Sequence, residues 1–155
     1  MLRSTHYELS DHSATLSVAE TLITNLKFNS IGRNKESYSL IRPKIEVIGK
    51  ILEDLCISPT IVTLDALLSV ACTIGSYDDI DQALFKYSTF NLTYSQYTFN
   101  TLLNRYANDA NTTAAFSLLE QMQGAHVDVD ITTLNTLVKL FIKVKNLEGI
   151  KKVFK

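Results

Sequence analysis

The side chains that commonly carry catalysis or bind metals are few in this 155-residue chain, and they are not grouped. Its three histidines, His6, His12 and His126, have no cysteine at the spacing of a metal site. The two cysteines, Cys56 and Cys72, lie in apolar stretches with helical spacing. This favours buried thiols in a reducing compartment over a disulfide. No metal site and no cofactor are therefore expected.

The densest group of carboxylates also has a structural explanation. Asp78, Asp79 and Asp81 follow Ser76, where a helix is expected to begin, and first-turn carboxylates stabilise the free N–H groups and the positive dipole end of a helix. The chain has no glycine-rich phosphate loop and no nucleophile motif. We therefore expect a protein that is not an enzyme.

Charge and hydropathy limit the kinds of molecule that this chain is expected to bind. The chain is 46% hydrophobic and 20% charged, as in ordinary soluble domains, and no apolar run approaches the roughly 18 residues of a membrane span. The net charge of −1 argues against a uniformly basic nucleic-acid binder. Residues 61–95 and 96–130 each have one basic and four acidic residues, whereas 131–155 have six and one. The C-terminal lysines fit either a solvated helix face or an RNA or ribosomal surface.

A repeated pattern of side chains organises the second half of the chain. The segment Tyr97–Leu103 aligns with residues 62–68 when it is moved back by 35 positions, and with residues 132–138 when it is moved forward by 35. The apolar positions that follow keep the same register: Ile80, Ala83 and Leu84 align with Ala115, Leu118 and Leu119, and with Ile150, Val153 and Phe154. A constant period near 35 is typical of an all-α solenoid of antiparallel helical hairpins.

This period predicts repeats at 61–95, 96–130 and 131–155, with helices over 61–73, 77–88, 96–108, 112–123, 131–144 and from 147 onward. Gly75 separates the first two helices, Gly124 is expected as a C-cap, and Ser76, Asn111 and Asn146 share one N-cap position. The third repeat stops within its second helix, which leaves an apolar face without cover. We therefore expect either a longer protein or a partner.

Residues 1–60 match the period weakly and are predicted to form a degenerate or capping helical pair. A helix is expected over 13–26, with Leu16, Ala19, Leu22, Ile23 and Leu26 on one face, a cap among residues 11–13 and a loop over 29–36. A second helix is expected to begin near Pro43 and to end before Pro59, with Ile45, Ile48, Leu52 and Leu55 on one face.

The segment Tyr97-Thr98-Phe99-Asn100-Thr101-Leu102-Leu103 resembles the opening of a pentatricopeptide repeat. Ala115, Leu118, Leu119 and Met122 stand where that family has a small residue, a Leu-Phe pair and a methionine, and Val129-Asp130 stands at the repeat end. The resemblance covers residues 61–155 well and implies a right-handed α-solenoid. It also implies binding of single-stranded RNA in mitochondria, one base per repeat.

The resemblance further implies which side chains would face RNA. The fifth and last residues of a repeat read the base, which gives Asp65 with Ser95, Asn100 with Asp130, and Asn135 with a partner beyond the chain. The central pair resembles the uracil-preferring one. An amide offers a donor and an acceptor to a base edge, and a carboxylate can hold it in place. The second position packs against the base, and it is occupied by Val62, Tyr97 and Thr132.

Several of these residues have an alternative interpretation. Asn100 and Asn135 fit either base readers or polar residues on an exposed face, and Asp130 fits an N-cap as well as a reader. Of Tyr97 and Phe99, one is expected in the core and the other in the groove. The lysine that often contacts the RNA backbone in this family is present only as Lys143.

Two functions follow from the resemblance. The first is a non-catalytic RNA-binding module in mitochondrial RNA stability, processing or translation. The second is a protein-interaction scaffold in a mitochondrial ribosome or another large assembly, favoured by the acidic central repeats and the missing lysines. The repeats could also be the recognition arm of a larger enzyme. Residues 1–10 resemble neither a secretory signal nor a good transit peptide.

Overall fold

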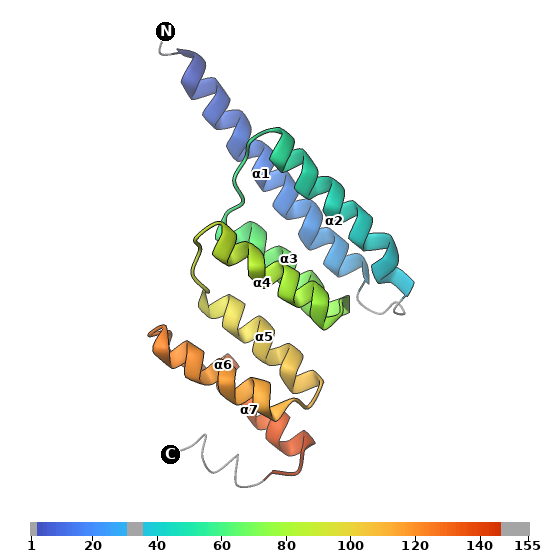
Figure 1. Ribbon diagram of the computed structural model, residues 1–155, viewed down its shortest axis with the longest axis vertical. Coiled ribbons are helices and arrows are strands. Elements are labelled where there is room, and N and C mark those ends of the chain that lie inside the picture. Colours follow the sequence, from blue (N-terminus) through green and yellow to red (C-terminus); the bar gives the residue numbers. More distant parts are fainter. Residues whose placement is uncertain (1–2, 31–35, 147–155) are drawn as a thin grey trace. The chain divides into compact units, whose positions relative to one another are not determined.

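The computed structural model describes residues 3–30 and 36–146, and every regular element in these ranges is a helix (Figure 1). The seven helices pack as stacked pairs, which confirms the all-α fold expected from the period. They are α1 (Arg3–Ser30), α2 (Glu36–Asp54), α3 (Ile61–Ile74), α4 (Tyr77–Thr89), α5 (Gln96–Asn108), α6 (Thr112–Gly124) and α7 (Ile131–Lys143). The chain divides into two compact units, residues 1–93 and 94–155, and each is described by itself.

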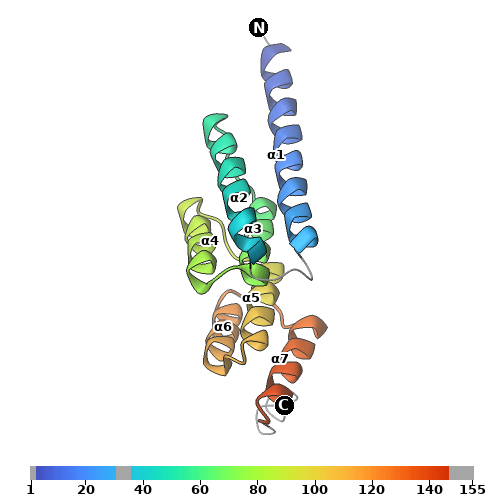
Figure 2. The same ribbon diagram turned by 90° about the vertical axis from the view of Figure 1, so that its right-hand side faces the viewer.

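In the first unit, α1 and α2 form a long antiparallel pair (Figures 1 and 2). The helix α3 packs against both α1 and α4. Ile23 of α1, Ile41 of α2 and Val70 of α3 are buried together in one cluster, and Val70 is fully buried. Ala19, Leu52 and Ile57 form a second buried cluster. Burial of these apolar side chains joins α1 to the hairpin that follows.

In the second unit, α5 occupies the central place and packs against both α6 and α7. Its core side chains Phe99, Leu102 and Leu103 are nearly inaccessible to solvent. Phe116 of α6 and Phe141 of α7 also meet, with ring centroids 5.5 Å apart. In each hairpin the odd-numbered helix comes first and the even-numbered helix second. The first helices are stacked in both units: α1 packs against α3, and α5 packs against α7.

The predicted helices are confirmed between residues 61 and 143. Each begins where the period placed it and ends within one residue of the expected position. Ser76 and Asn111 are N-caps as predicted, and Gly75 ends α3. The helix predicted from 147, with Ile150, Val153 and Phe154, lies outside the described residues. The division into repeats remains a prediction.

The helix ends repeat at the same interval as the helix starts. The second helices are followed by residues with φ near +55°, and the backbone N–H of the next residue donates to a carbonyl five residues earlier, over 2.8–3.0 Å. This left-handed ending satisfies carbonyls that the helix leaves free. The residues with positive φ are Cys56, Asn91 and His126 after the second helices, and Ala110 and Lys145 after the first helices.

Several N-terminal predictions are wrong. The helix α1 begins at Arg3, so the predicted cap residues 11–13 lie inside it, and it includes residues 29 and 30 of the predicted loop. Apolar spacing marks only the part of a helix that packs, and no Gly or Pro precedes Gly32 to stop α1 earlier. The helix α2 likewise begins at Glu36, with Pro43 inside it rather than in its first turn.

Some burial and capping predictions are also wrong. Leu22 and Leu55 were assigned to packed faces but are exposed. Cys72 is buried as expected, whereas Cys56 is exposed because it occupies the left-handed position after α2. Gly124 is the last residue of α6, and Ala125 forms the cap. The side chain of Leu26 lies outside the described part.

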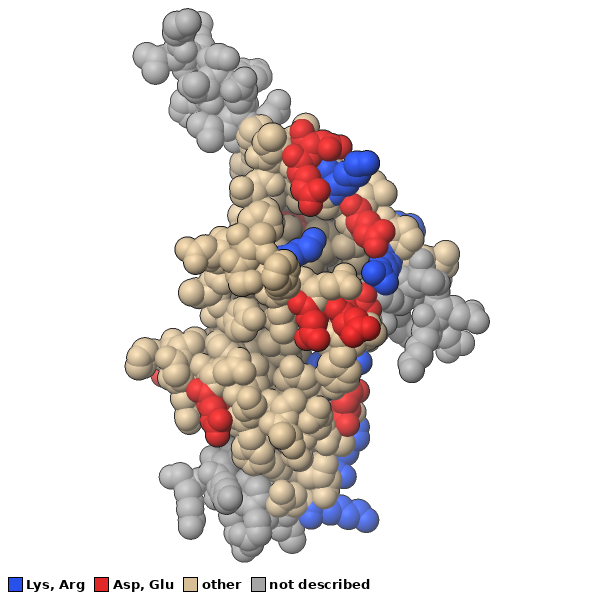
Figure 3. All heavy atoms as spheres, viewed as in Figure 1, with Lys and Arg blue, Asp and Glu red and all other residues tan. Residues whose placement is uncertain are grey.

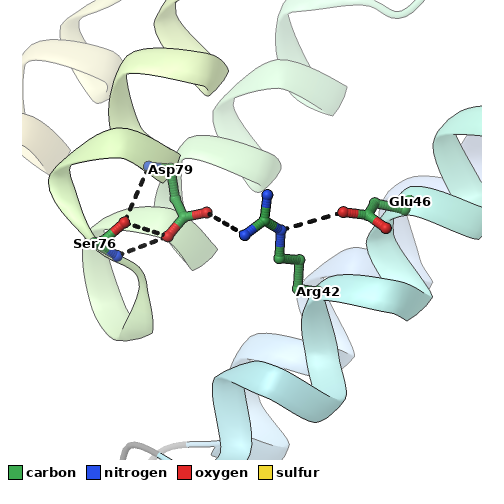
Figure 4. Close-up of polar contacts among 4 residues, drawn as sticks. All are labelled: Arg42, Glu46, Ser76 and Asp79. Atoms are coloured by element: carbon green, nitrogen blue, oxygen red, sulfur yellow. Dashed lines mark hydrogen bonds and ion pairs between the residues drawn. The ribbon is translucent and has the colours of Figure 1, made fainter.

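A charged contact links α2 to the start of α4 (Figure 4). The Asp79 carboxylate accepts hydrogen bonds from the Ser76 backbone N–H at 2.8 Å and from its hydroxyl at 2.6 Å. The Arg42 guanidinium lies 3.9 Å from the other Asp79 oxygen and 3.2 Å from Glu46. The pair of Arg42 with Glu46 is exposed and stabilises little, and the contact of Arg42 with Asp79 is long, so the cap is the stronger part of this contact. Acidic and basic side chains are interspersed on this face (Figure 3).

Within the described ranges, the structure contains no helix that is both long and apolar enough to cross a membrane.

Replacing Ala110 by glycine should stabilise the second unit by about 1 kcal/mol, because a Cβ at positive φ is strained. Urea unfolding of the full chain measures this. Ala114→Gly, within the first turn of α6, is the control and should destabilise by up to about 1 kcal/mol. If both variants lose stability equally, the left-handed ending after α5 is wrong.

Candidate nucleic-acid interface

A buried threonine stands at the third position of each first helix from α3 onward. These residues, Thr63, Thr98 and Thr133, are at most 1% exposed. Each backbone N–H donates to the N-cap side chain three residues earlier, over 3.3, 3.1 and 2.7 Å respectively. The N-cap residues are Thr60, Ser95 and Asp130. Since an unpaired buried hydroxyl costs about 1–3 kcal/mol, each threonine also needs a partner for its side chain.

At the start of α7, that partner is the amide of the predicted base reader. The Thr133 hydroxyl lies 2.7 Å from Asn100 Oδ1 and 2.8 Å from Asp130 Oδ1. The Asn100 amide nitrogen lies 3.4 and 3.5 Å from the two Asp130 carboxylate oxygens. The structure therefore brings Asn100 and Asp130 together as predicted. It also adds Thr133, which the sequence analysis did not assign to the site.

The electrostatics of this cluster depend on Asp130. The backbone N–H of Thr133 lowers the pKa of the Asp130 carboxyl, helped by the Thr133 hydroxyl and the Asn100 amide. The carboxylate thus remains charged and caps α7, so both interpretations of Asp130, as a cap and as a partner of Asn100, are compatible with its geometry. The cluster presents an amide whose orientation is fixed at both ends.

The other predicted pair is arranged differently. Asp65 accepts a 2.6 Å hydrogen bond from the hydroxyl of the buried Tyr87 on α4. Ser95 belongs to the other unit, where its side chain forms the capping box of α5 with Thr98. Met122 stands at the position of Tyr87 one period later and cannot donate such a bond to Asn100.

The predicted base-packing side chains all face outward. Val62 is 56% exposed and Tyr97 is 52% exposed, and Thr132 is also exposed. Phe99, two residues after Tyr97, is 2% exposed and forms an edge-to-face contact with Tyr94. The expectation that Tyr97 and Phe99 divide between surface and core is confirmed.

Asn135 and Lys143 both lie on α7, and both are exposed. The Lys143 ammonium donates to the backbone carbonyl of Asn108, the last residue of α5. A cation at this place offsets the negative end of the α5 dipole and pairs a free carbonyl. The lysine expected to contact an RNA backbone therefore joins two first helices in this structure.

No group of three or more His, Cys, Asp or Glu side chains able to hold a metal ion occurs in the described part of the chain. The carboxylates Asp78 and Asp79 occupy the first turn of α4, where they support its N-terminus.

The sequence did contain a signal for the missed threonines. A capping residue followed three positions later by threonine recurs at Thr60, Ser95 and Asp130, at the same interval as the apolar pattern. Apolar spacing alone does not reveal this pattern, because threonine is polar. A polar residue at a buried third position indicates that its side chain has a hydrogen-bonding partner.

Replacing Asp130 by serine should change how stability depends on pH. The pKa of Asp130 is lowered in the fold, so its stabilising effect is present above about pH 4 and is lost as the pH falls through the lowered value. Urea unfolding from pH 7 to pH 3 should show the free energies of wild type and Asp130→Ser converging at low pH. Asp128→Ser, at an exposed position two residues earlier, is the control. A difference that stays constant over this range would contradict the role of Asp130.

Comparison with known protein families finds a match for part of the second unit. Residues 117–155, which include most of α6 and all of α7, match the pentatricopeptide repeat domain. No curated protein matches the chain. Residues 117–155 are therefore similar to a pentatricopeptide repeat domain, and the seven described helices, packed as stacked pairs, are consistent with an array of such repeats.

Proposed function

We propose that this chain is a non-catalytic module that binds single-stranded RNA and prefers uridine at its central repeat. Pentatricopeptide domains are helical repeat modules that typically bind RNA, and the family is generally non-catalytic. The single observation that carries the uridine preference is the cluster in which Thr133 and Asp130 hold the amide of Asn100.

The chemistry of that amide suits uracil. The edge of uracil presents one N–H donor next to carbonyl acceptors, and an asparagine side chain offers one acceptor and a two-proton donor. An amide that is free to rotate loses entropy when it binds. The Asn100 amide is already held by side chains from α7, so less entropy is lost.

The outward-facing side chains near the start of the first helices support the stacking of a base on each of these helices. Val62, Tyr97 and Thr132 occupy one position on three first helices and are all exposed. A base that stacks on Tyr97 gains about 1–3 kcal/mol whatever its identity. In this proposal Tyr97 and its equivalents supply affinity, and the fifth residues supply selectivity.

The cellular setting of this proposal comes from the resemblance. Proteins with such repeats act in mitochondrial RNA stability, processing or translation, and we propose the same compartment and role here. The proposal is independent of the exact transcript, because the described residues define one amide cluster and not a full recognition code.

A second candidate is a scaffold within a mitochondrial ribosome or another protein assembly. The position of Lys143 favours this candidate, because its ammonium group binds the backbone carbonyl at the end of α5 and is not reserved for an RNA phosphate. Phosphate contacts supply much of the affinity for nucleic acids, and residues 96–130 have four acidic residues against one arginine. A co-purified protein partner with no retained RNA would favour this candidate.

Asn100→Ala should weaken binding to uridine-rich single-stranded RNA about tenfold and remove the preference for uridine over cytidine, because one well-placed base contact contributes about 1–3 kcal/mol. Fluorescence anisotropy with labelled 12-nucleotide RNAs measures both effects. Asn104→Ala, at an exposed position one turn later on α5, is the control and should leave the affinity unchanged. An unchanged preference for uridine in Asn100→Ala would reject Asn100 as the reader.

A further inference from the structure

The helix α1 has a carboxylate where α5 has the amide of Asn100. Glu20 Oε1 accepts hydrogen bonds from the hydroxyls of Thr60 and Thr63, both at 2.8 Å. In the second unit, Asn100 Oδ1 accepts from the hydroxyl of Thr133 at 2.7 Å. Thr63 and Thr133 are both the third residue of the next first helix, and both are buried. Glu20 therefore stands in the same contact with α3 as Asn100 does with α7.

The buried side chains of α1 confirm this register. Ala19 and Ile23 are 6% and 1% exposed, and the residues 45 positions later, Leu64 and Leu68, are buried in α3. Residues 35 positions further on, Phe99 and Leu103, are buried in α5. The polar residue that follows the first of each pair is Glu20, Asp65 and Asn100 in turn. The interval from α1 to α3 is thus 45 residues instead of 35.

The second helix of this pair keeps the shorter interval. Leu52 in α2 is 35 positions before Tyr87 in α4, and both are buried. The left-handed residues after the two helices, Cys56 and Asn91, are also 35 positions apart. The ten additional residues therefore lie between the packed parts of α1 and α2. This explains why a search at a constant interval of 35 finds α2 but misses α1.

We infer that α1 and α2 form a complete repeat with a longer connection, and that Glu20 is its base-contacting residue, selective for a base with an amino group over uracil. This inference rests on the proposed function, because it extends RNA recognition to the N-terminal pair. In this inference the pair α1 and α2 is not a cap without a binding role, but supplies a fourth position that reads RNA.

The chemistry of the carboxylate gives the selectivity. A carboxylate accepts hydrogen bonds and donates none. Glu20 Oε1 already accepts from two hydroxyls, and no described residue donates to Oε2. Cytosine, adenine and guanine each present an amino group to such an oxygen. The single N–H of uracil lies between two carbonyl oxygens, which a carboxylate repels. Glu20 and Asn100 therefore select different bases.

Selection from a randomised pool of single-stranded RNA tests this inference with the full chain. Bound RNA is sequenced for wild type, Glu20→Gln and Glu20→Asn, with Glu120→Gln on the exposed face of α6 as a control. Wild type should enrich uridine at one position and deplete uridine at two others, because Asp65 is also a carboxylate at the reading place. Both Glu20 variants should lose the depletion at one of these two positions at least fivefold and keep the enrichment, whereas Glu120→Gln should change neither.

The two possible failures can be distinguished. If uridine is enriched at one position but no position is depleted of uridine, or if every depletion of the wild type survives in both Glu20 variants, the role of Glu20 is wrong and the proposed function stands. If wild type enriches no base at any position, the proposed function is wrong and the role of Glu20 falls with it. Circular dichroism of each variant shows that any lost selectivity does not result from unfolding of α1.

Discussion

Within each unit, one kind of hydrogen bond joins two first helices: it links a buried threonine to the polar side chain of the first helix before it. Thr133 makes it to Asn100 and Thr63 makes it to Glu20. The backbone N–H of each threonine also donates to the N-cap side chain of its own helix. The same residue therefore takes part in the helix cap and in the contact with the first helix before it. Every buried side-chain nitrogen and oxygen among the described residues has a partner. A misplaced neighbour would lose this hydrogen bond between the two helices, which contributes about 1 kcal/mol.

This arrangement places the candidate site at the contact between two stacked helices. The side chain proposed to contact a base is the same side chain that receives the threonine, so its orientation is set by packing before any ligand arrives. The residue at this place can differ between repeats, as amide or carboxylate, because either can accept from a hydroxyl. The stacking of the helices therefore fixes the position of this side chain but permits either an amide or a carboxylate there. A module that reads different bases requires this variation.

The apolar interval of 35 predicted the helices from residue 61 onward, because each buried position recurs without insertion. The family resemblance, and not the interval, predicted the proximity of Asn100 and Asp130. It failed for α1, where ten additional residues before α2 break the interval, and for Cys56, whose exposure follows from a left-handed backbone that composition does not reveal. The binding of Lys143 to the end of α5 was also missed, since a lysine near a helix terminus fits a phosphate contact equally well.

A double-mutant cycle between Asn100 and Thr133 tests the central claim most directly. The free energy of unfolding is measured for wild type, Asn100→Ala, Thr133→Val and the double variant. A hydrogen bond between the two side chains predicts a coupling energy of about 1 kcal/mol, with the double variant less destabilised than the sum of the single variants. Additive effects, within about 0.3 kcal/mol, would show that Thr133 does not hold Asn100 and would contradict this account of the stack.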